Sequence, residues 1–284
     1  MVARGWTRAG GRPHAEAEAL AMAGTAAEGA TLYVSLEPCA HESLRGPACT
    51  DLVCRSGLAR VVVGVEDPDP RTAGDGIARI RAAGIAVNLA GDPACRASLV
   101  GFFLRFAEGR PYVTLKLAIS LDGRIALADG SSQWITGEVA RAHVHAMRAQ
   151  ADAILCGGGT LRADAPRLDV RLPGLEHRSP ERLVLTRSAA PAGWRALASP
   201  EAIRSLPEIQ YLFVEGGAST AASFLAADLV DRILLYRAPI VIGAGLPAIG
   251  DCGLADLASA HGRWRLADRR QLGSDGLEVY ERAR

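Results

Sequence analysis

The sequence predicts an α/β fold divided into two domains. Apolar runs of strand length alternate with amphipathic segments of helical period along most of the chain, which is typical of α/β proteins. A Gly-Arg-Pro break at residues 109–111 separates two such stretches. The 284 residues also exceed the usual size of one domain. We therefore expect one domain over residues 1–109 and a second over residues 110–284.

The first half reads as strands interleaved with helices. The run ARVVVGVED is nearly all apolar, which predicts a strand buried on both faces. GIARIRAAG has a helical pattern and ends at a glycine. The expected strands cover residues 31–38, 59–67 and 85–91, and the expected helices cover residues 76–84 and 93–108.

The second half repeats the alternation and ends differently. Its last segment predicts two antiparallel strands around a Gly-Ser-Asp-Gly turn at residues 273–276. Residues 172–180 are rich in proline, glycine and charge, which predicts a loop. The other expected strands cover residues 112–123, 152–158, 182–188, 211–217 and 231–243, and helices cover residues 137–150 and 219–227.

Composition excludes several classes of protein. Thirty-two basic against 31 acidic residues give a net charge of +1, which disfavours binding to nucleic acid by bulk attraction to phosphate. No apolar run reaches the ~18 residues that span a bilayer, and the N-terminus lacks the apolar region of a signal peptide. We therefore expect a cytoplasmic protein without a membrane partner. In that compartment the six cysteines indicate thiols or metal ligands, not disulfides.

Three segments of the first half predict a zinc site. Pro13-His14-Ala15-Glu16, Pro38-Cys39 and Cys49 follow the H-x-E…P-C…C order of zinc nucleobase deaminases. Imidazole and thiolates are ligands that zinc prefers, and a catalytic site leaves the fourth position to water. We expect His14, Cys39 and Cys49 to bind Zn²⁺ and Glu16 to carry protons from water to substrate.

The other residues near these segments are less specific. Pro38 fits the first turn of a helix, and a helix N-terminus would favour the thiolate of Cys39. His41 lies between the cysteine ligands, where it would either contact the substrate or cover the site. The remaining cysteines have no evident metal partners and are interpreted as structural, namely Cys54, Cys95, Cys156 and Cys252.

The second half contains two glycine turns that predict anion binding. Gly157–Gly159 and Glu215–Thr220 each follow a predicted strand and open a predicted helix, where free backbone N–H groups attract anions. No G-x-G-x-x-G motif indicates a Rossmann site. Lys116 is the only lysine among 32 basic residues. It would either have a role that a guanidinium cannot fill, or be an exception in an arginine-rich composition.

Longer motifs resemble one family, the bifunctional deaminase–reductases of riboflavin biosynthesis. Nine residues, AHESLRGPA, separate Cys39 from Cys49, where other zinc deaminases have two. This loop and the segment ARVVVGVEDPDPRTAGDGIARIRAAGI are similar to that family. KLAISLDG, SQWIT, TLRADAPRLDVR and VEGG extend the resemblance over nearly all of residues 110–284. It implies a cytidine-deaminase-like three-layer α/β/α domain followed by a dihydrofolate-reductase-like α/β domain.

The resemblance also implies ligands for the second domain. The residues implied to contact NADPH are Ala118, Trp134, Thr160, Asp164, Gly217, Ala218, Ser219, Thr220, Ala221, Ala222 and Ser223. Those implied to contact a phosphorylated pyrimidine substrate are Ser132, Arg148, Leu168, Arg171 and Glu215, and Lys116 is a further candidate. Arginines suit the substrate phosphate because their fork matches its oxygens. Family analogy also predicts a homo-oligomer formed through the reductase domain.

The implied activity is bifunctional. Zinc-dependent deamination of 2,5-diamino-6-(ribosylamino)-4(3H)-pyrimidinone 5′-phosphate would be followed by NADPH-dependent reduction of the ribosyl chain, which gives 5-amino-6-(5-phosphoribitylamino)uracil. One alternative is a reductase whose deaminase domain is truncated and inactive. Another is a deaminase that edits RNA or DNA, which the net charge and the 5% aromatic content oppose.

Three departures from the family pattern carry expectations of their own. Family members have a helix and a strand before the segment that matches Val2–Gly5, so we expect a misassigned start, with a truncated deaminase half as the alternative. The loop between Cys39 and Cys49 is about one residue longer than usual. The segment from Arg187 to Gln210 is shorter than usual, which affects the adenosine end of the NADPH site.

Overall fold

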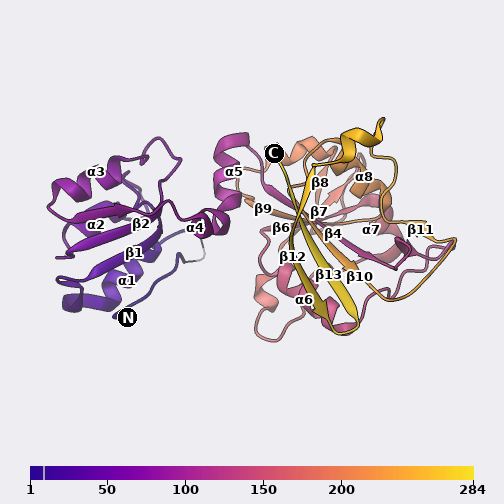
Figure 1. Ribbon diagram of the computed structural model, residues 1–284, viewed down its shortest axis with the longest axis horizontal. Coiled ribbons are helices and arrows are strands. Elements are labelled where there is room, and N and C mark those ends of the chain that lie inside the picture. Colours follow the sequence, from indigo (N-terminus) through magenta and orange to yellow (C-terminus); the bar gives the residue numbers. More distant parts are fainter. Residues whose placement is uncertain (9) are drawn as a thin grey trace. The chain divides into compact units, whose positions relative to one another are not determined.

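The computed structural model describes residues 1–8 and 10–284 of the chain. Its contacts divide the chain into two compact units, Met1–Phe106 and Ala107–Arg284, which run from indigo to yellow in Figure 1. Each unit has its own sheet and its own hydrophobic core. The α/β class that the sequence predicts is therefore confirmed.

The first unit is built on a parallel sheet in the order β1-β2-β3. Val61 and Val63 of β2 are fully buried in a core that includes side chains of α1, α2 and α3. Gly64 points to the opposite face, where a Cβ would lie 2.5 Å from Sγ of Cys95 in α4. Helices therefore cover both faces, as in a three-layer α/β/α domain. Its elements are α1 (Ala15–Ala23), η1 (Gly24–Ala27), β1 (Thr31–Leu36), α2 (Cys49–Cys54), β2 (Arg60–Val65), α3 (Asp75–Ala82), β3 (Ala86–Leu89) and α4 (Pro93–Ser98), and α5 (Val100–Glu108) runs across the division between the two units.

The helix predicted over residues 93–108 needs correction, and helices α1 and α2 were not predicted. The helix expected over residues 93–108 is two helices, because the chain leaves helical geometry at Leu99. The Ser98 hydroxyl donates to the carbonyl of Cys95 at 2.8 Å, a local bond that competes with continued helix. Helix α1 was not predicted, since its sequence AEAEALAMA lacks an apolar stripe of helical period.

The second unit has an eight-stranded sheet in the order β12-β13-β10-β4-β9-β6-β7-β8. Pairing is parallel from β10 to β8, whereas β13 runs antiparallel to both β10 and β12. The elements are β4 (Tyr112–Ile119), β5 (Arg124–Ala126), α6 (Glu138–Arg148), β6 (Ala153–Gly157), α7 (Gly158–Asp164), η2 (Glu176–Arg178), β7 (Glu181–Leu185), β8 (Arg195–Leu197), η3 (Pro200–Ser205), β9 (Tyr211–Glu215), α8 (Ala218–Ala226), β10 (Arg232–Arg237), β11 (Leu246–Pro247), η4 (Leu257–Ala260), β12 (Trp264–Leu272) and β13 (Asp275–Arg282).

Helices cover both faces of this sheet as well. Phe224 of α8 packs with Leu115 of β4 in one core cluster. Val144 of α6 packs with Ile154 and Tyr236 in a second cluster. The carboxyl ends of β4, β6 and β9 are neighbours in the sheet, which is where open α/β sheets bind ligands.

The strands expected over residues 112–123 and 231–243 end earlier than predicted, at Ile119 and Arg237. Asp122 links the segments that follow these two strands. Its carboxylate accepts the backbone N–H groups of Ile242 at 3.1 Å and Gly243 at 2.7 Å, and so fixes both segments outside the sheet. Bonds from the Ser120 hydroxyl and these two amides lower the pKa of Asp122 to about 2. The expected C-terminal hairpin is confirmed, with Gly273 at φ +65° in its turn.

A buried ion pair joins the starts of β4 and β10. Arg110 is 1% exposed and donates to both carboxylate oxygens of Asp231, at 2.7 and 2.9 Å. Asp231 also accepts the backbone N–H of Val113 at 2.8 Å and pairs with Arg284. Because both charges are shielded from water, removing one leaves the other without its buried partner, and only the more exposed Arg284 or Glu108 remains to pair with it.

We expect Arg110→Met to destabilise the second unit by about 3–5 kcal/mol, because Asp231 would keep its charge without its buried partner. The control is Arg195→Met, which breaks a half-exposed pair with Glu208 and should cost less than about 1 kcal/mol. Urea-dependent hydrogen exchange of the β4 and β10 amides measures the stability of this unit. Equal stability of the two variants would contradict the role given to the buried pair.

Candidate functional site

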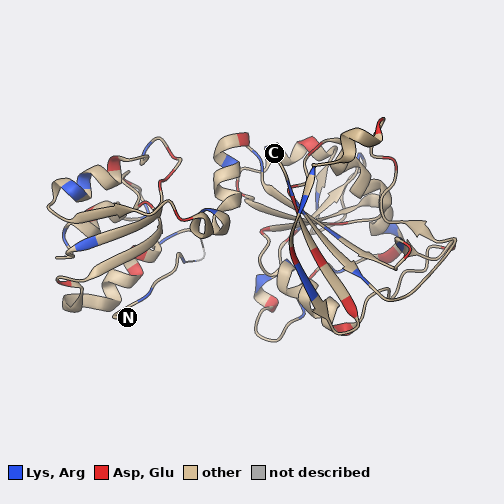
Figure 2. Cartoon of the chain, viewed as in Figure 1, with Lys and Arg blue, Asp and Glu red and all other residues tan. Residues whose placement is uncertain are grey.

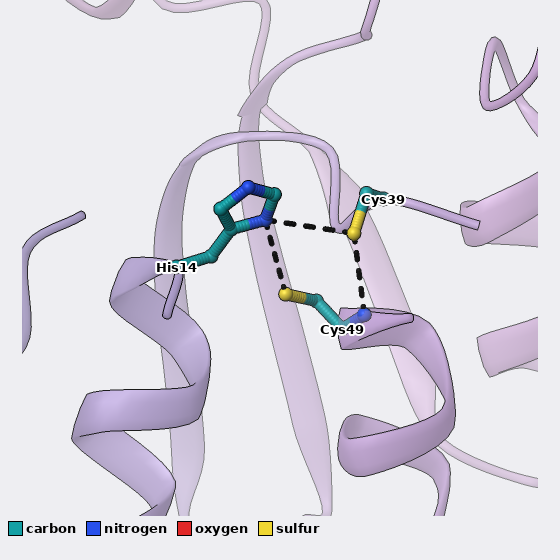
Figure 3. A group of neighbouring side chains, drawn as sticks. All are labelled: His14, Cys39 and Cys49. Carbon is teal, nitrogen blue, oxygen red and sulfur yellow. Dashed lines mark hydrogen bonds between the residues drawn. The ribbon is translucent and has the colours of Figure 1, made fainter. Parts of the chain in front are cut away.

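The zinc site predicted in the first unit has the shape that zinc requires. Nδ1 of His14 lies 3.5 Å from Sγ of Cys39 and 3.4 Å from Sγ of Cys49, and all three atoms lie within 4.8 Å of one another (Figure 3). Tetrahedral zinc with its usual bond lengths would hold nitrogen and sulfur ligands about 3.5 Å apart. The donor set and the spacing therefore fit zinc. Among the described residues, no other three His, Cys, Asp or Glu side chains converge in this way.

Each ligand comes from a different element. His14 caps the N-terminus of α1, Cys39 lies in the loop after β1, and Cys49 is the first residue of α2. The expectation of a helix starting at Pro38 is therefore wrong. A helix N-terminus does act on Cys39, but from α2, because the backbone N–H of Cys49 donates to its sulfur at 3.3 Å. Hydrogen bonds from Cys49 and His14 lower the pKa of Cys39.

Glu16 lies on the first turn of α1, beside the ligands. Its side chain is buried, and its carboxyl group lies near the Cys49 thiol. Burial, assisted by the charge of Cys39, raises the pKa of Glu16. A carboxyl group with a raised pKa beside a metal site is suited to accepting and returning a proton near neutral pH.

Sequence reasoning missed the residues that hold the loop of Cys39. The Thr50 hydroxyl donates to the carbonyls of Pro38 at 2.9 Å and Cys39 at 3.0 Å. Buried Glu37 accepts the backbone N–H of Ile77 at 2.9 Å, as well as those of Gly74 at 3.0 Å and Asp67 at 3.2 Å. The sequence signal was Glu37 itself, a charged residue between an apolar strand and a proline–cysteine pair.

Two other residues border the zinc site. Arg12 donates to Sγ of Cys39 at 3.5 Å and to the carbonyl of Pro47 at 2.7 Å, a pair of contacts that the sequence did not predict. His41 is half-buried, with Nδ1 3.3 Å from the hydroxyl oxygen of Thr72. The two roles expected of His41, contact with substrate or cover of the site, stay predictions.

In the second unit, the two glycine turns meet. A Cβ on Gly157 would lie 2.2 Å from Oγ1 of Thr220, and one on Gly217 would lie 3.7 Å from Oγ1 of Thr160. Thr160 and Asp164 lie on α7, and Gly217 caps α8, which holds the expected cofactor contacts Ala218–Ser223. The structure thus places both helix N-termini side by side, at the ends of adjacent strands. This cradle fits a phosphate-bearing cofactor such as NADPH.

The expected substrate residues include a buried ion cluster. Glu215 at the end of β9 accepts Nε and Nη2 of Arg148 at 2.6 and 3.0 Å, and it lies 3.6 Å from Nζ of Lys116. Burial acts to raise the pKa of Glu215, but the charges of Lys116 and Arg148 outweigh it and the pKa is lowered. The third nitrogen of Arg148 donates to the carbonyl of Asp169 at 2.9 Å. All three guanidinium nitrogens of Arg148 therefore have hydrogen-bond partners within the protein.

The other expected substrate and cofactor residues lie in loops and strands of the second unit. Ala118 is two residues beyond Lys116 on β4. Leu168 is buried in the core cluster that α6 covers, and Ala118 packs against the same cluster. The side chain of Arg171 is 52% exposed, and its backbone N–H donates to His145 at 3.2 Å. Ser132 and Trp134 lie in the loop before α6, where the Arg141 guanidinium stacks 4.9 Å from the Trp134 ring.

The fold and the two sites define the class: a zinc-dependent deaminase unit joined to a dihydrofolate-reductase-like unit. Residues 1–65 match the family model for the cytidine and deoxycytidylate deaminase zinc-binding region, and residues 111–277 match that for the RibD C-terminal domain. The riboflavin biosynthesis protein RibD of Aquifex aeolicus is 37% identical over 99% of this chain and 89% of its own length. That of Escherichia coli is 38% identical over 97% and 88%.

Solved structures agree with these matches. The chain superposes over its whole length, and over 89% of the other chain, on a diaminohydroxyphosphoribosylaminopyrimidine deaminase/5-amino-6-(5-phosphoribosylamino)uracil reductase from Thermotoga maritima, with a TM-score of 0.89 and 30% identity. Acinetobacter baumannii RibD gives the same TM-score and coverage at 32% identity. The chain belongs to the RibD family of riboflavin biosynthesis proteins. It is an enzyme with a zinc-dependent deaminase domain and an NADPH-dependent reductase domain, and the reductase-only alternative is not supported.

None of the helices formed by the described residues combines the length and apolar composition needed to cross a membrane. Basic and acidic residues are interspersed along the elements of both units (Figure 2), as on β13, where Glu278 and Glu281 pair with neighbouring arginines. This distribution does not favour the alternative of an enzyme that edits nucleic acid.

We expect Cys49→Ser to lower zinc affinity by more than about 100-fold, because replacing a ligand costs more than the 10- to 100-fold typical of residues behind the ligands. Cys54→Ser is the matched control on the same helix, since Cys54 lies outside the metal group. Competition with a chelator, followed by metal analysis, measures the zinc affinity of both variants. Full zinc retention by Cys49→Ser would remove Cys49 from the ligand set.

Proposed function

We propose that the chain converts 2,5-diamino-6-(ribosylamino)-4(3H)-pyrimidinone 5′-phosphate to 5-amino-6-(5-phosphoribitylamino)uracil in two steps. The first unit replaces a ring amine by a carbonyl, using water and releasing ammonia. The second adds a hydride and a proton to the ribosyl group and opens it to a ribityl chain. The observation that carries the proposal is the convergence of His14, Cys39 and Cys49 beside the buried carboxyl group of Glu16.

The deaminase step follows from the residues around that site. His14, Cys39 and Cys49 would hold zinc through one imidazole and two thiolates, and the bound metal would supply the Lewis acidity that activates water at neutral pH. Glu16 accepts the first proton of the attacking water and delivers it to the ring nitrogen. It then takes the second proton from the new hydroxyl group and passes it to the departing amine as the carbonyl forms. Burial raises the pKa of its carboxyl group, which favours accepting a proton from water.

The reductase step uses the cradle and the ion cluster of the second unit. NADPH supplies the hydride when bound. We assign its contacts to Ala118, Trp134, Thr160, Asp164 and the run Gly217–Ser223, and the substrate contacts to Ser132, Arg148, Leu168, Arg171 and Glu215. Because Arg148 is paired with Glu215, we assign the substrate phosphate to the more exposed Arg171. Lys116 orients the Glu215 carboxylate.

The remaining assignments complete the proposal. We place the functional boundary at residues 109 and 110, close to the division between Phe106 and Ala107 that the contacts give. A cytoplasmic enzyme that assembles as a homo-oligomer through its reductase domain stays a prediction from family analogy.

A product assay tests the proposed function. The purified chain is incubated with the diaminopyrimidine substrate, zinc and NADPH, and the product is identified by mass spectrometry. The proposal predicts a product with one amine exchanged for a carbonyl and two added hydrogens. Untouched substrate, together with conversion of the already deaminated compound, would support a reductase alone.

We expect Glu16→Gln to retain zinc but to lose ammonia release by about 10²- to 10⁴-fold, because the amide cannot carry the proton. Glu18→Gln is the control on the same helix, since Glu18 pairs with Arg8 at the surface. Reduction of the deaminated compound should be unchanged in both variants. Normal ammonia release by Glu16→Gln would remove Glu16 from the mechanism.

We expect Arg171→Met to raise the KM for the phosphorylated substrate of the reductase by about 10- to 100-fold, because a charged hydrogen bond to the phosphate is lost. Arg167→Met is the control: Arg167 also pairs with Asp169 but is 74% exposed and has no assigned contact. Steady-state kinetics with the deaminated compound measure the effect. Equal KM values for the two variants would move the phosphate site elsewhere.

A further inference from the structure

Arg12 connects three parts of the zinc site. Its Nη2 donates to Sγ of Cys39 at 3.5 Å, and its Nη1 donates to the carbonyl of Pro47 at 2.7 Å. It precedes His14 by two residues, and Pro47 lies two residues before Cys49. One planar guanidinium thus bridges the segment of the histidine ligand, one sulfur ligand, and the loop that leads to the other.

We propose that Arg12 is a positioning residue that tunes the zinc site through the sulfur of Cys39. This inference rests on the zinc-dependent deaminase activity proposed above. An N–H donor draws electron density from a thiolate, so the sulfur gives less charge to a metal that it binds. The metal is then a stronger Lewis acid toward water.

The two cysteine ligands lie in different electrostatic surroundings. Cys39 faces the Arg12 guanidinium and also accepts the backbone N–H of Cys49 at 3.3 Å. Cys49 instead faces the carboxyl group of Glu16. Both cysteines are almost fully buried, at 5% and 1% exposure, so these neighbouring charges are poorly screened by water. Arg12 therefore donates a hydrogen bond to one sulfur ligand, Cys39, although its charge also reaches Cys49 and His14.

Arg45 provides a matched comparison. It lies in the loop between the cysteines and donates through Nη1 to the carbonyl of Gly10, which ties this loop to the N-terminal segment. Arg12 makes the same kind of tie through Pro47, but it adds the bond to sulfur. Comparing the two arginines separates an effect on the thiolate from the anchoring of the loop.

The test replaces zinc by Co²⁺ in the full chain and records the sulfur-to-cobalt charge-transfer band. Arg12→Met should shift this band to lower energy, because the sulfur loses its donor, whereas Arg45→Met should leave its position unchanged. Arg12→Lys keeps the charge without the fork, so its band should lie between those of Arg12→Met and the parent chain. With zinc loading verified by metal analysis, Arg12→Met should release ammonia about 10- to 100-fold more slowly.

Each other outcome is decisive. A band that does not move in Arg12→Met, or that moves equally in Arg45→Met, would overturn the proposal. If Arg12→Met does not fold, the test uses Arg12→Lys alone. A shift of its charge-transfer band to lower energy than that of the parent chain supports the proposal, and an unchanged band overturns it. The cobalt spectra need no substrate, so an inactive parent chain would count against the proposed deaminase function and not against this inference.

Discussion

A tetrahedral zinc ion requires its nitrogen and sulfur ligands about 3.5 Å apart, and this requirement governs the architecture of the first unit. His14, Cys39 and Cys49 come from segments up to 35 residues apart. A short sequence motif cannot bring residues so far apart to one metal, so the helices and loops of the fold must position them. The start of α1 presents the histidine, the start of α2 presents one cysteine, and the loop after β1 presents the other.

The supporting bonds converge on that loop. Thr50 bonds to the backbone of the loop, and Glu37 fixes the residue at which the loop begins. Arg12 donates to the sulfur of Cys39. Gly76 allows α3 to approach, since a Cβ there would lie 2.4 Å from the carbonyl of Pro38. Residues far from the metal ligands in sequence therefore determine the geometry of the site. The second unit uses the same principle, because Gly157 and Gly216 leave room for the Thr220 side chain between the two turns.

Much of this could be predicted from the sequence, because strands and ligands leave local signals. The apolar run of β2 and the terminal hairpin were predicted from pattern alone, and the order of His14, Glu16, Cys39 and Cys49 predicted the metal group that the structure assembles. Predictions failed where tertiary contacts decide. Helix α1 has no amphipathic stripe, and β4 ends at Ile119 because Asp122 binds a segment 120 residues away.

Contacts between distant charged side chains were also beyond the sequence. Arginine makes up nearly all of the basic residues, so nothing in composition distinguishes Arg12 or Arg148 from surface charges. Only the fold shows that Arg148 is committed to Glu215 and that Arg12 meets Cys39. Lys116 is the exception, because its rarity drew attention to it, and it does lie in the ion cluster of Glu215.

We propose that one histidine and two cysteines hold a catalytic zinc ion with a position left for water. X-ray absorption at the zinc edge of the purified chain tests it most directly. The account predicts two sulfur neighbours at about 2.3 Å and two lighter neighbours at about 2.0–2.1 Å, one from imidazole and one from water. A shell of four sulfurs, a shell without sulfur, or a chain that binds no zinc would contradict it.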